Sequence, residues 1–139
     1  MNAHLSWISR LLLALIFILS GFMKITGFAG VSGFLASLGW PAPGLWLTLA
    51  ILFELGGGLC LLLGYRVRWA SLALIIFVVL ATALVHGALL SHAADAAAKQ
   101  DQTVNILKNI AIIGGLLKYY LDGAGRYALD SGESPSGRA

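Results

Sequence analysis

The sequence has few charged residues: Asp, Glu, Lys and Arg make up 11% of its 139 residues, against about one quarter in soluble domains. So little charge excludes a disordered chain and an ordinary cytosolic globule. The sequence also lacks a basic run with interleaved aromatic residues, which argues against a nucleic-acid binder. Hydrophobic residues make up 59% of the chain, more than one soluble core of this length can cover. The sequence therefore predicts an integral membrane protein.

Cysteine is also scarce. Cys60 is the single cysteine, which excludes an intrachain disulfide and a redox dithiol within this chain, and we interpret it as apolar filler. The histidines His4, His86 and His92 lack the spacing of a zinc site. The run Gly56-Gly57-Gly58 lies inside an apolar stretch and follows no strand, so it is not a phosphate-binding loop. The sequence thus predicts no metal site.

Four long apolar stretches take up most of the chain, at about residues 5–23, 45–63, 70–90 and 104–121. Each has the length of a helix that crosses a hydrocarbon core of about 30 Å. They are predicted to be helices because open strand edges leave backbone groups unsatisfied in lipid. We expect an all-α membrane protein in which residues 1–130 form a bundle of four transmembrane helices, followed by a disordered tail at residues 131–139.

The loop between the first two stretches has a helical pattern of its own. Val31, Phe34, Leu35 and Leu38 recur at helical spacing, and Gly39 follows them. This predicts a short helix with one apolar face that ends near the glycine. It is too short to span a bilayer, so we expect it at the outer surface.

Aromatic residues lie at the ends of the predicted spans, as in the interfacial belts of membrane proteins. They are Trp7, Trp40, Trp46, Trp69, Tyr65, Tyr119 and Tyr120. An alternative interpretation is that they form the core of a soluble bundle. A separate alternative makes the first span a secretory signal peptide, because Arg10 precedes its apolar run and small residues follow near Gly27.

Lys and Arg are distributed unequally between the two ends of the predicted bundle. The end with both termini holds six of them: Arg10, Arg66, Arg68, Lys118, Arg126 and Arg138. The other end holds Lys24, Lys99 and Lys108. The positive-inside rule therefore predicts that both termini are cytoplasmic.

Glu54 is the candidate functional residue that the sequence indicates most strongly. It lies at the middle of the second span and is the only acidic residue before Asp95. An ionised carboxylate at that depth costs roughly 2.5–3.5 kcal/mol or more. We expect Glu54 either to pair with a cation or to carry a proton. Gly57 and Gly58 share its helix face and allow a second helix to approach, so Glu54 is predicted to face protein.

Further polar residues are expected in the outer half of the bundle, from three other helices. They are Lys24, His86, Lys108 and Asn109. The long side chains of Lys24 and Lys108 could reach toward Glu54. Structural interpretations stay open beside the functional one: a buried ion pair for Glu54, snorkelling for Lys108, and hydrogen bonds that only hold helices together.

Several segments of the chain match a known pattern. They are Ser20-Gly-Phe-Met-Lys24, Phe34-Leu-Ala-Ser-Leu-Gly39-Trp-Pro41, Glu54 with its glycines and Leu61-Leu-Leu-Gly64, His86, Leu107-Lys108-Asn109-Ile-Ala-Ile-Ile-Gly-Gly115 and Gly123-Ala-Gly125-Arg-Tyr-Ala-Leu129-Asp130. Over about residues 5–130 the chain resembles the DoxX family of small bacterial and archaeal membrane proteins. Ala124 and Ala128 replace the proline and serine that are usual in the family's closing segment.

The resemblance implies a four-helix protein of the bacterial inner membrane with a polar site in its outer half. The family is named for a membrane component associated with a thiosulfate:quinone oxidoreductase, and most members are named as oxidoreductases without a defined substrate. The implied function is a quinone-linked membrane oxidoreductase, or a subunit of such a complex with a soluble or membrane partner.

On this hypothesis Glu54 and His86 are catalytic residues that move protons. Lys108, Asn109 and His86 donate hydrogen bonds to the quinone, and Lys24 balances the charge of Glu54. Two other functions stay open. One is a non-catalytic carrier or binding protein for a small lipophilic or anionic ligand. The other is a membrane scaffold in which the polar residues only specify helix pairing.

Overall fold

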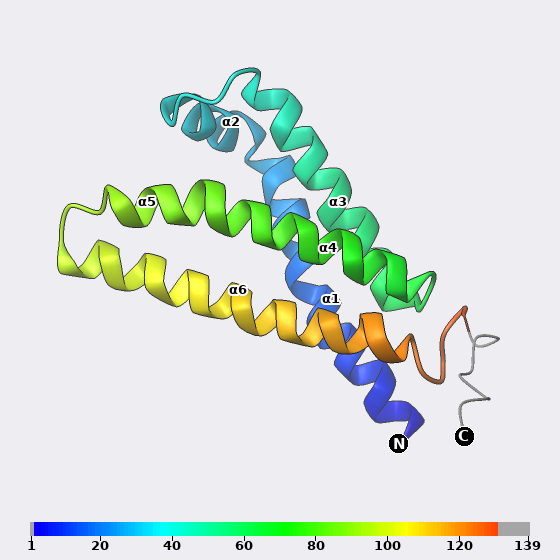
Figure 1. The fold of residues 1–139 in the computed structure, drawn as a ribbon. Coiled ribbons are helices and arrows are strands. Elements are labelled where there is room, and N and C mark those ends of the chain that lie inside the picture. The colour runs from blue at the N-terminus through cyan, green and yellow to red at the C-terminus, as the bar shows by residue number, and fades with distance from the viewer. Residues whose placement is uncertain (1, 131–139) are drawn as a thin grey trace.

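The structure is a computed structural model that describes residues 2–130, so the predicted disordered tail at residues 131–139 lies outside the described residues. All regular elements in this part of the chain are helical (Figure 1). They are α1 (Ala3–Thr26), α2 (Phe28–Ser37), α3 (Pro43–Leu63), α4 (Val67–Ala81), the π-helical turn η1 (Thr82–His86), α5 (Gly87–Ser91) and α6 (Ala96–Asp122). The elements α4, η1 and α5 form one continuous helix of 25 residues.

The all-α class is confirmed, but the prediction of four apolar spans is corrected. Among residues 2–130, three helices are long and apolar enough to cross a membrane: α1, α3 and the continuous helix α4–η1–α5. The predicted fourth span at 104–121 lies within α6, which is helical over 27 residues but is too polar to qualify. The reason is chemical: Asn105, Lys108, Asn109 and Lys118 interrupt its apolar sequence.

The helices are arranged as two antiparallel pairs. Helix α1 packs along α3, with α2 against α3, and α6 packs along α4 (Figure 1). The contact between α3 and α4 joins the pairs. Among the described helices, η1 and α5 contact only α4, α6 and each other. The pairs therefore diverge away from the α3–α4 turn, with α2 at the far end of one pair and the α5–α6 loop at the far end of the other (Figure 1).

Two adjacent glycines bring α3 close to both neighbouring helices. A Cβ atom on Gly57 would lie 2.7 Å from Leu74 of α4. A Cβ atom on Gly58 would lie 3.1 Å from Phe17 and Ile18 of α1. Larger residues would push the helices apart, because helix interfaces in membranes are held by close packing of small residues. The close helix approach predicted for these two glycines is confirmed.

The short helix predicted over residues 31–38 is observed as α2, which begins three residues earlier and ends at Ser37. Its Leu35 is buried against Leu47 and Ile51 of α3. Helix α3 then begins at Pro43, in the first turn, where a proline is well tolerated. Helix α2 thus covers the N-terminal part of α3, because its apolar face packs there.

Residues 123–130, here called the closing segment, bind back across the α3–α4 turn. The carboxylate Oδ2 of Asp130 accepts a hydrogen bond from the backbone N–H of Val67 at 3.0 Å, and the Asp130 N–H donates to the Gly64 carbonyl at 2.9 Å. The fully buried guanidinium of Arg10 donates to the Tyr127 carbonyl. Arg10, counted in the sequence as an orienting charge, therefore also fastens the closing segment to α1.

The outer surface of the described helices is largely apolar, with side chains such as Leu12, Leu52 and Ile76 more than half exposed. A soluble protein does not expose so much apolar area. Trp69 is 71% exposed, and Trp7, Trp46 and Tyr65 are also exposed, so the soluble-core interpretation of the aromatic residues is wrong.

The first span is a packed part of the fold, because Ala14 and Phe17 of α1 belong to the central core. Removal of a signal peptide would take both side chains out of that core. The structure therefore favours the interpretation of the first span as a helix of the bundle.

Candidate functional site

Glu54 is buried between α1 and α3, with only 4% of the residue exposed. Lys24 Nζ lies 2.9 Å from its Oε2 and 3.1 Å from its Oε1. Ser20 Oγ donates to Oε1 at 2.9 Å and accepts from Lys24 Nζ at 2.6 Å. The three residues form a closed triangle, here called the Glu54 cluster. Glu54 therefore faces protein and pairs with a cation, as the sequence predicts.

The local sequence explains why this cluster forms. Ser20 and Lys24 are four residues apart on α1 and therefore share one face. Gly21 lies beside them, and a Cβ atom there would come within 2.7 Å of Leu55. The absence of a side chain lets α1 approach α3 at the level of Glu54. The short polar arm of Ser20 then reaches the carboxylate directly.

The Glu54 cluster leads from the interior of the protein toward its outer surface. The Glu54 side chain is 6% exposed, whereas that of Lys24 is 26% exposed. Lys24 is therefore nearer the surface than Glu54, and its long side chain lets the ammonium group reach the carboxylate. Such a chain of donors and acceptors can hold a charge in the membrane and can pass a proton between the carboxylate and the C-terminal end of α1.

A second group of polar side chains lies between the continuous helix and α6, and we call Thr82, His86, Gln102 and Asn109 the His86 cluster. His86 Nδ1 and Gln102 Oε1 are 2.9 Å apart, and the amide oxygen can only accept, so Nδ1 donates. Asn109 Nδ2 donates to Thr82 Oγ1 at 2.9 Å. Thr82 and His86 are the first and last residues of the π turn η1, a distortion often found at functional sites.

The sequence predicts one constellation of five polar residues, and the structure divides it between two helix pairs. Lys24 and Glu54 meet on α1 and α3. His86 bonds to Gln102, and Asn109 bonds to Thr82, both between the continuous helix and α6. Lys108 is exposed and donates to Asn105 on its own helix. The backbone of α3 does not closely approach η1, α5 or α6, and Lys108 bonds to Asn105 instead of Glu54.

The prediction that His86, Lys108 and Asn109 donate hydrogen bonds to a quinone stays a prediction. Asn109 donates to Thr82 and His86 to Gln102, but the Asn109 amide has a second N–H and the Lys108 ammonium has three. The pocket found in the structure lies elsewhere, between α3 and α4, and none of the five lines it.

Sequence reasoning missed Ser20 and Thr82, each of which completes one cluster. Both are four residues before a predicted site residue, Lys24 or His86, on the same helix. A search for hydroxyl groups at this spacing would have found them. The structural role of Arg10 was also missed, because its partners belong to the closing segment, more than 100 residues away.

Comparison with known proteins agrees with this architecture. The DoxX family model matches residues 5–87, which contain α1 to α4 together with Glu54 and His86. The chain belongs to the DoxX family. Inner membrane protein YqjF of Escherichia coli K12 is 35% identical over 123 residues, covering 88% of this chain and 87% of its own length. Inner membrane protein YphA of the same organism is 34% identical over 123 residues, covering 88% and 86%.

No solved structure matches the chain. The family match ends just after His86, so Lys108, Asn109 and the closing segment lie outside the matched residues, although the two relatives extend the similarity over most of the chain. The DoxX membership and the three apolar spans together identify an integral membrane protein.

Proposed function

We propose that this DoxX protein is the membrane subunit of a quinone-linked oxidoreductase complex, in which Glu54 exchanges protons between the membrane interior and the outer surface. The observation that carries the proposal is the buried carboxylate of Glu54 at the middle of α3, bonded to Lys24 and Ser20. An ionisable group at this depth is costly. Quinone reduction consumes protons as well as electrons, so a proton-carrying carboxylate within the membrane suits such a complex.

The electron carrier and the principal quinone contacts belong, in this proposal, to a partner subunit. Lys24 and Ser20 hold the charged form of Glu54 and connect it to the surface. His86 is the second proton-exchanging residue, and its Nδ1–H bond to Gln102 turns Nε2 into the acceptor. Asn109 faces Thr82. Lys108 belongs to the partner-facing side of α6, where it is exposed and can meet an anionic or carbonyl group.

We further propose that α6 crosses the membrane beside the three apolar helices, in the bacterial inner membrane. It runs antiparallel to the 25-residue helix α4–η1–α5 and contacts all three parts of it. The closing segment that follows α6 is bonded to the α3–α4 turn. A helix that starts at the far end and finishes at this turn traverses the same thickness as its partner. Its polar residues Gln102 and Asn109 are then satisfied by His86 and Thr82 of η1.

The start of α1, the closing segment and the α3–α4 turn share one end of this arrangement, and we propose that this end, with both termini, is cytoplasmic. Arg66, Arg68 and Arg126 gather there, and the positive-inside rule assigns such an end to the cytoplasm. A cysteine at an exposed position in α2, such as Gly33→Cys, should react with a membrane-impermeant maleimide in intact cells. A cysteine replacing Arg126 should react only after the membrane is opened. The reverse pattern would contradict the orientation.

The function is tested with thiosulfate as electron donor and a soluble short-chain quinone as acceptor, in membranes with and without the chain. Two thiosulfate ions join through a new S–S bond and release two electrons, which reduce the quinone together with two protons. We expect quinone reduction to require the chain. Glu54→Gln should lower the rate by about 100-fold or more, as for the loss of a general acid–base.

A matched control is Asp122→Asn, which removes an exposed carboxylate of α6 that pairs with Lys118. It should keep the rate. A rate that is independent of the chain, or equal in Glu54→Gln and the parent, would reject the proposal. The scaffold alternative gives a different result: Glu54→Gln would lower the amount of assembled complex, and the complex that remains would keep its full turnover.

A further inference from the structure

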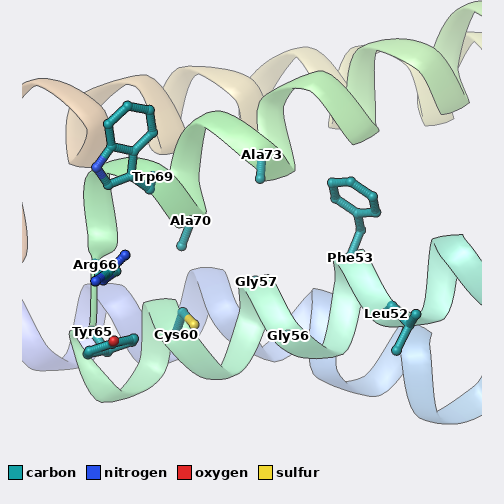
Figure 2. Close-up of a pocket in the computed structure, with 10 residues that line it drawn as sticks. All are labelled: Leu52, Phe53, Gly56, Gly57, Cys60, Tyr65, Arg66, Trp69, Ala70 and Ala73. Atoms are coloured by element: carbon teal, nitrogen blue, oxygen red, sulfur yellow. The ribbon is translucent and has the colours of Figure 1, made fainter.

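The pocket between α3 and α4 is an open groove on the outside of the bundle, with a volume of about 360 Å³. Its floor consists of small residues: Gly56, Gly57, Cys60, Ala70 and Ala73. Figure 2 shows Phe53 and Leu52 at one end and the turn between the helices at the other. The groove faces away from the protein, so in a membrane protein it is open to lipid.

The end of the groove at the α3–α4 turn differs from the rest. Tyr65, Arg66 and Trp69 surround it (Figure 2). Aromatic residues of this kind lie at the level of the lipid headgroups. The Arg66 guanidinium lies 5.7 Å from the Tyr65 ring centroid, and it has no acidic partner among residues 2–130. No Asp or Glu lines the groove. The groove therefore joins an apolar channel to one cation at the interface.

We infer that this groove binds one anionic phospholipid, with an acyl chain between α3 and α4 and the phosphate on Arg66. The length supports this occupant. The lining runs from Leu52 to the end of α3 at Leu63 and on to Tyr65, roughly 17–20 Å at 1.5 Å per residue. One leaflet of a hydrocarbon core of about 30 Å has a comparable thickness. Arginine binds phosphate through two parallel hydrogen bonds.

The negative charge of the lipid distinguishes it from other possible occupants of the groove. A neutral quinone or a second copy of the chain could fill the apolar part of the groove, but neither would need a cation at its interfacial end. Basic groups beside membrane helices on the cytoplasmic side attract anionic headgroups. The site involves no residue of either polar cluster and is independent of the proton exchange proposed for Glu54, although its cytoplasmic position rests on the proposed orientation.

Trp69 makes the site directly observable. In a full-length variant with Trp7, Trp40 and Trp46 replaced by Phe, Trp69 is the only remaining tryptophan. Its fluorescence is measured in phosphatidylcholine vesicles that contain a minor fraction of phosphatidylglycerol brominated in its acyl chains. The reference uses brominated phosphatidylcholine with the same chains. We expect phosphatidylglycerol to bind about fivefold more tightly, the effect of one arginine near the membrane surface.

Two variants with matched controls separate the headgroup from the acyl chain. Arg66→Asn should abolish the preference for phosphatidylglycerol, and asparagine suits the positive φ of 44° at this position. Arg68→Gln, a neighbouring arginine that does not line the groove, should keep the preference. Gly56→Leu should weaken quenching by both lipids, because its side chain enters open space in the groove. Gly114→Leu, which also enters open space but on α6, should change nothing.

Each other outcome overturns the inference. Equal quenching by both brominated lipids, or equal effects of Arg66→Asn and Arg68→Gln, would mean that no anionic site exists. Relief of quenching by a short-chain quinone would make the occupant a quinone. Protection of Trp69 from both lipids, together with a dimeric mass in detergent, would make it a second copy. Helical content from circular dichroism confirms that each variant is folded.

Discussion

The Glu54 cluster and the His86 cluster both place polar side chains between membrane helices, but they do so with different chemistry. The first contains a carboxylate and an ammonium group, and its carboxylate is buried. The second contains an imidazole, two amides and a hydroxyl group, and its residues are half-buried. A charged pair needs both partners, because either one alone is an uncompensated charge. A neutral hydrogen bond between membrane helices is worth about 0.6 kcal/mol on average.

The helices around the two clusters differ accordingly. Gly21 lets α1 and α3 close tightly beside the ion pair, whereas the continuous helix loosens into the π turn η1 beside His86. Only in the Glu54 cluster, therefore, should a change of ionisation state alter the free energy of unfolding substantially. The second is suited to hold helices together while His86 stays free at one ring nitrogen.

The largest effect is expected for Lys24→Met, which leaves Glu54 buried without its cation. The free energy of unfolding should fall by about 3–5 kcal/mol, as when one partner of a buried pair is removed. It is measured by unfolding in mixed micelles with increasing dodecyl sulfate. The double variant with Lys24→Met and Glu54→Gln should recover most of the loss. Equal losses in the single and double variants would mean that the pair is not coupled.

A smaller effect is expected for Gly21→Leu, which forces α1 away from α3 at the level of Glu54. Overpacking of a close interface costs about 1–3 kcal/mol. The same unfolding measurement applies, and Gly114→Leu is the control, because a side chain there meets no other atom within 4 Å. If both glycine variants lose the same stability, close approach at Gly21 does not support the ion pair.

In the His86 cluster, Asn109→Leu should cost about 0.6–1.7 kcal/mol, the range for one interhelical hydrogen bond in a membrane protein. The variant removes the donor to Thr82 and keeps a side chain of similar size. Thr82→Val, measured alone and together with it, gives the coupling energy. A loss as large as that of Lys24→Met would reverse the ranking of the two clusters.

The smallest effect on stability is expected for Ser20→Ala, about 0.6 kcal/mol, because Lys24 still pairs with Glu54. The variant should nevertheless slow proton exchange at Glu54, since Ser20 bonds to both charged groups. Exchange is followed by time-resolved infrared spectroscopy after a pH jump. Unchanged exchange would remove Ser20 from the proton path, and Thr26→Ala on the same helix is the control.

Much of the fold follows from the sequence because a membrane span is a local property. The second span, predicted at 45–63, is observed as Pro43–Leu63, and the third, at 70–90, as Val67–Ser91. The pairing of Glu54 with a cation was also predictable, since a charge at mid-membrane has few alternatives. Length, apolarity and the cost of an isolated charge are all readable from one sequence.

What could not be predicted depends on which helices are neighbours. Lys108 and Glu54 were expected at similar depth, but depth does not fix lateral position, and the backbones of α3 and α6 do not closely approach each other. The partners of Arg10 lie in an irregular segment that has no periodicity to detect. The π turn at His86 likewise has no sequence rule, because it arises where α4 and α6 pack against each other.

The central claim, that Glu54 exchanges a proton while buried in the membrane, is tested most directly by infrared difference spectroscopy of the protein in lipid nanodiscs. The measurement compares spectra before and after acidification, for the parent and Glu54→Gln. The account predicts a carboxylic-acid carbonyl band that appears on acidification of the folded parent and is absent in Glu54→Gln. A parent spectrum without that band over the whole pH range in which the protein stays folded would contradict it.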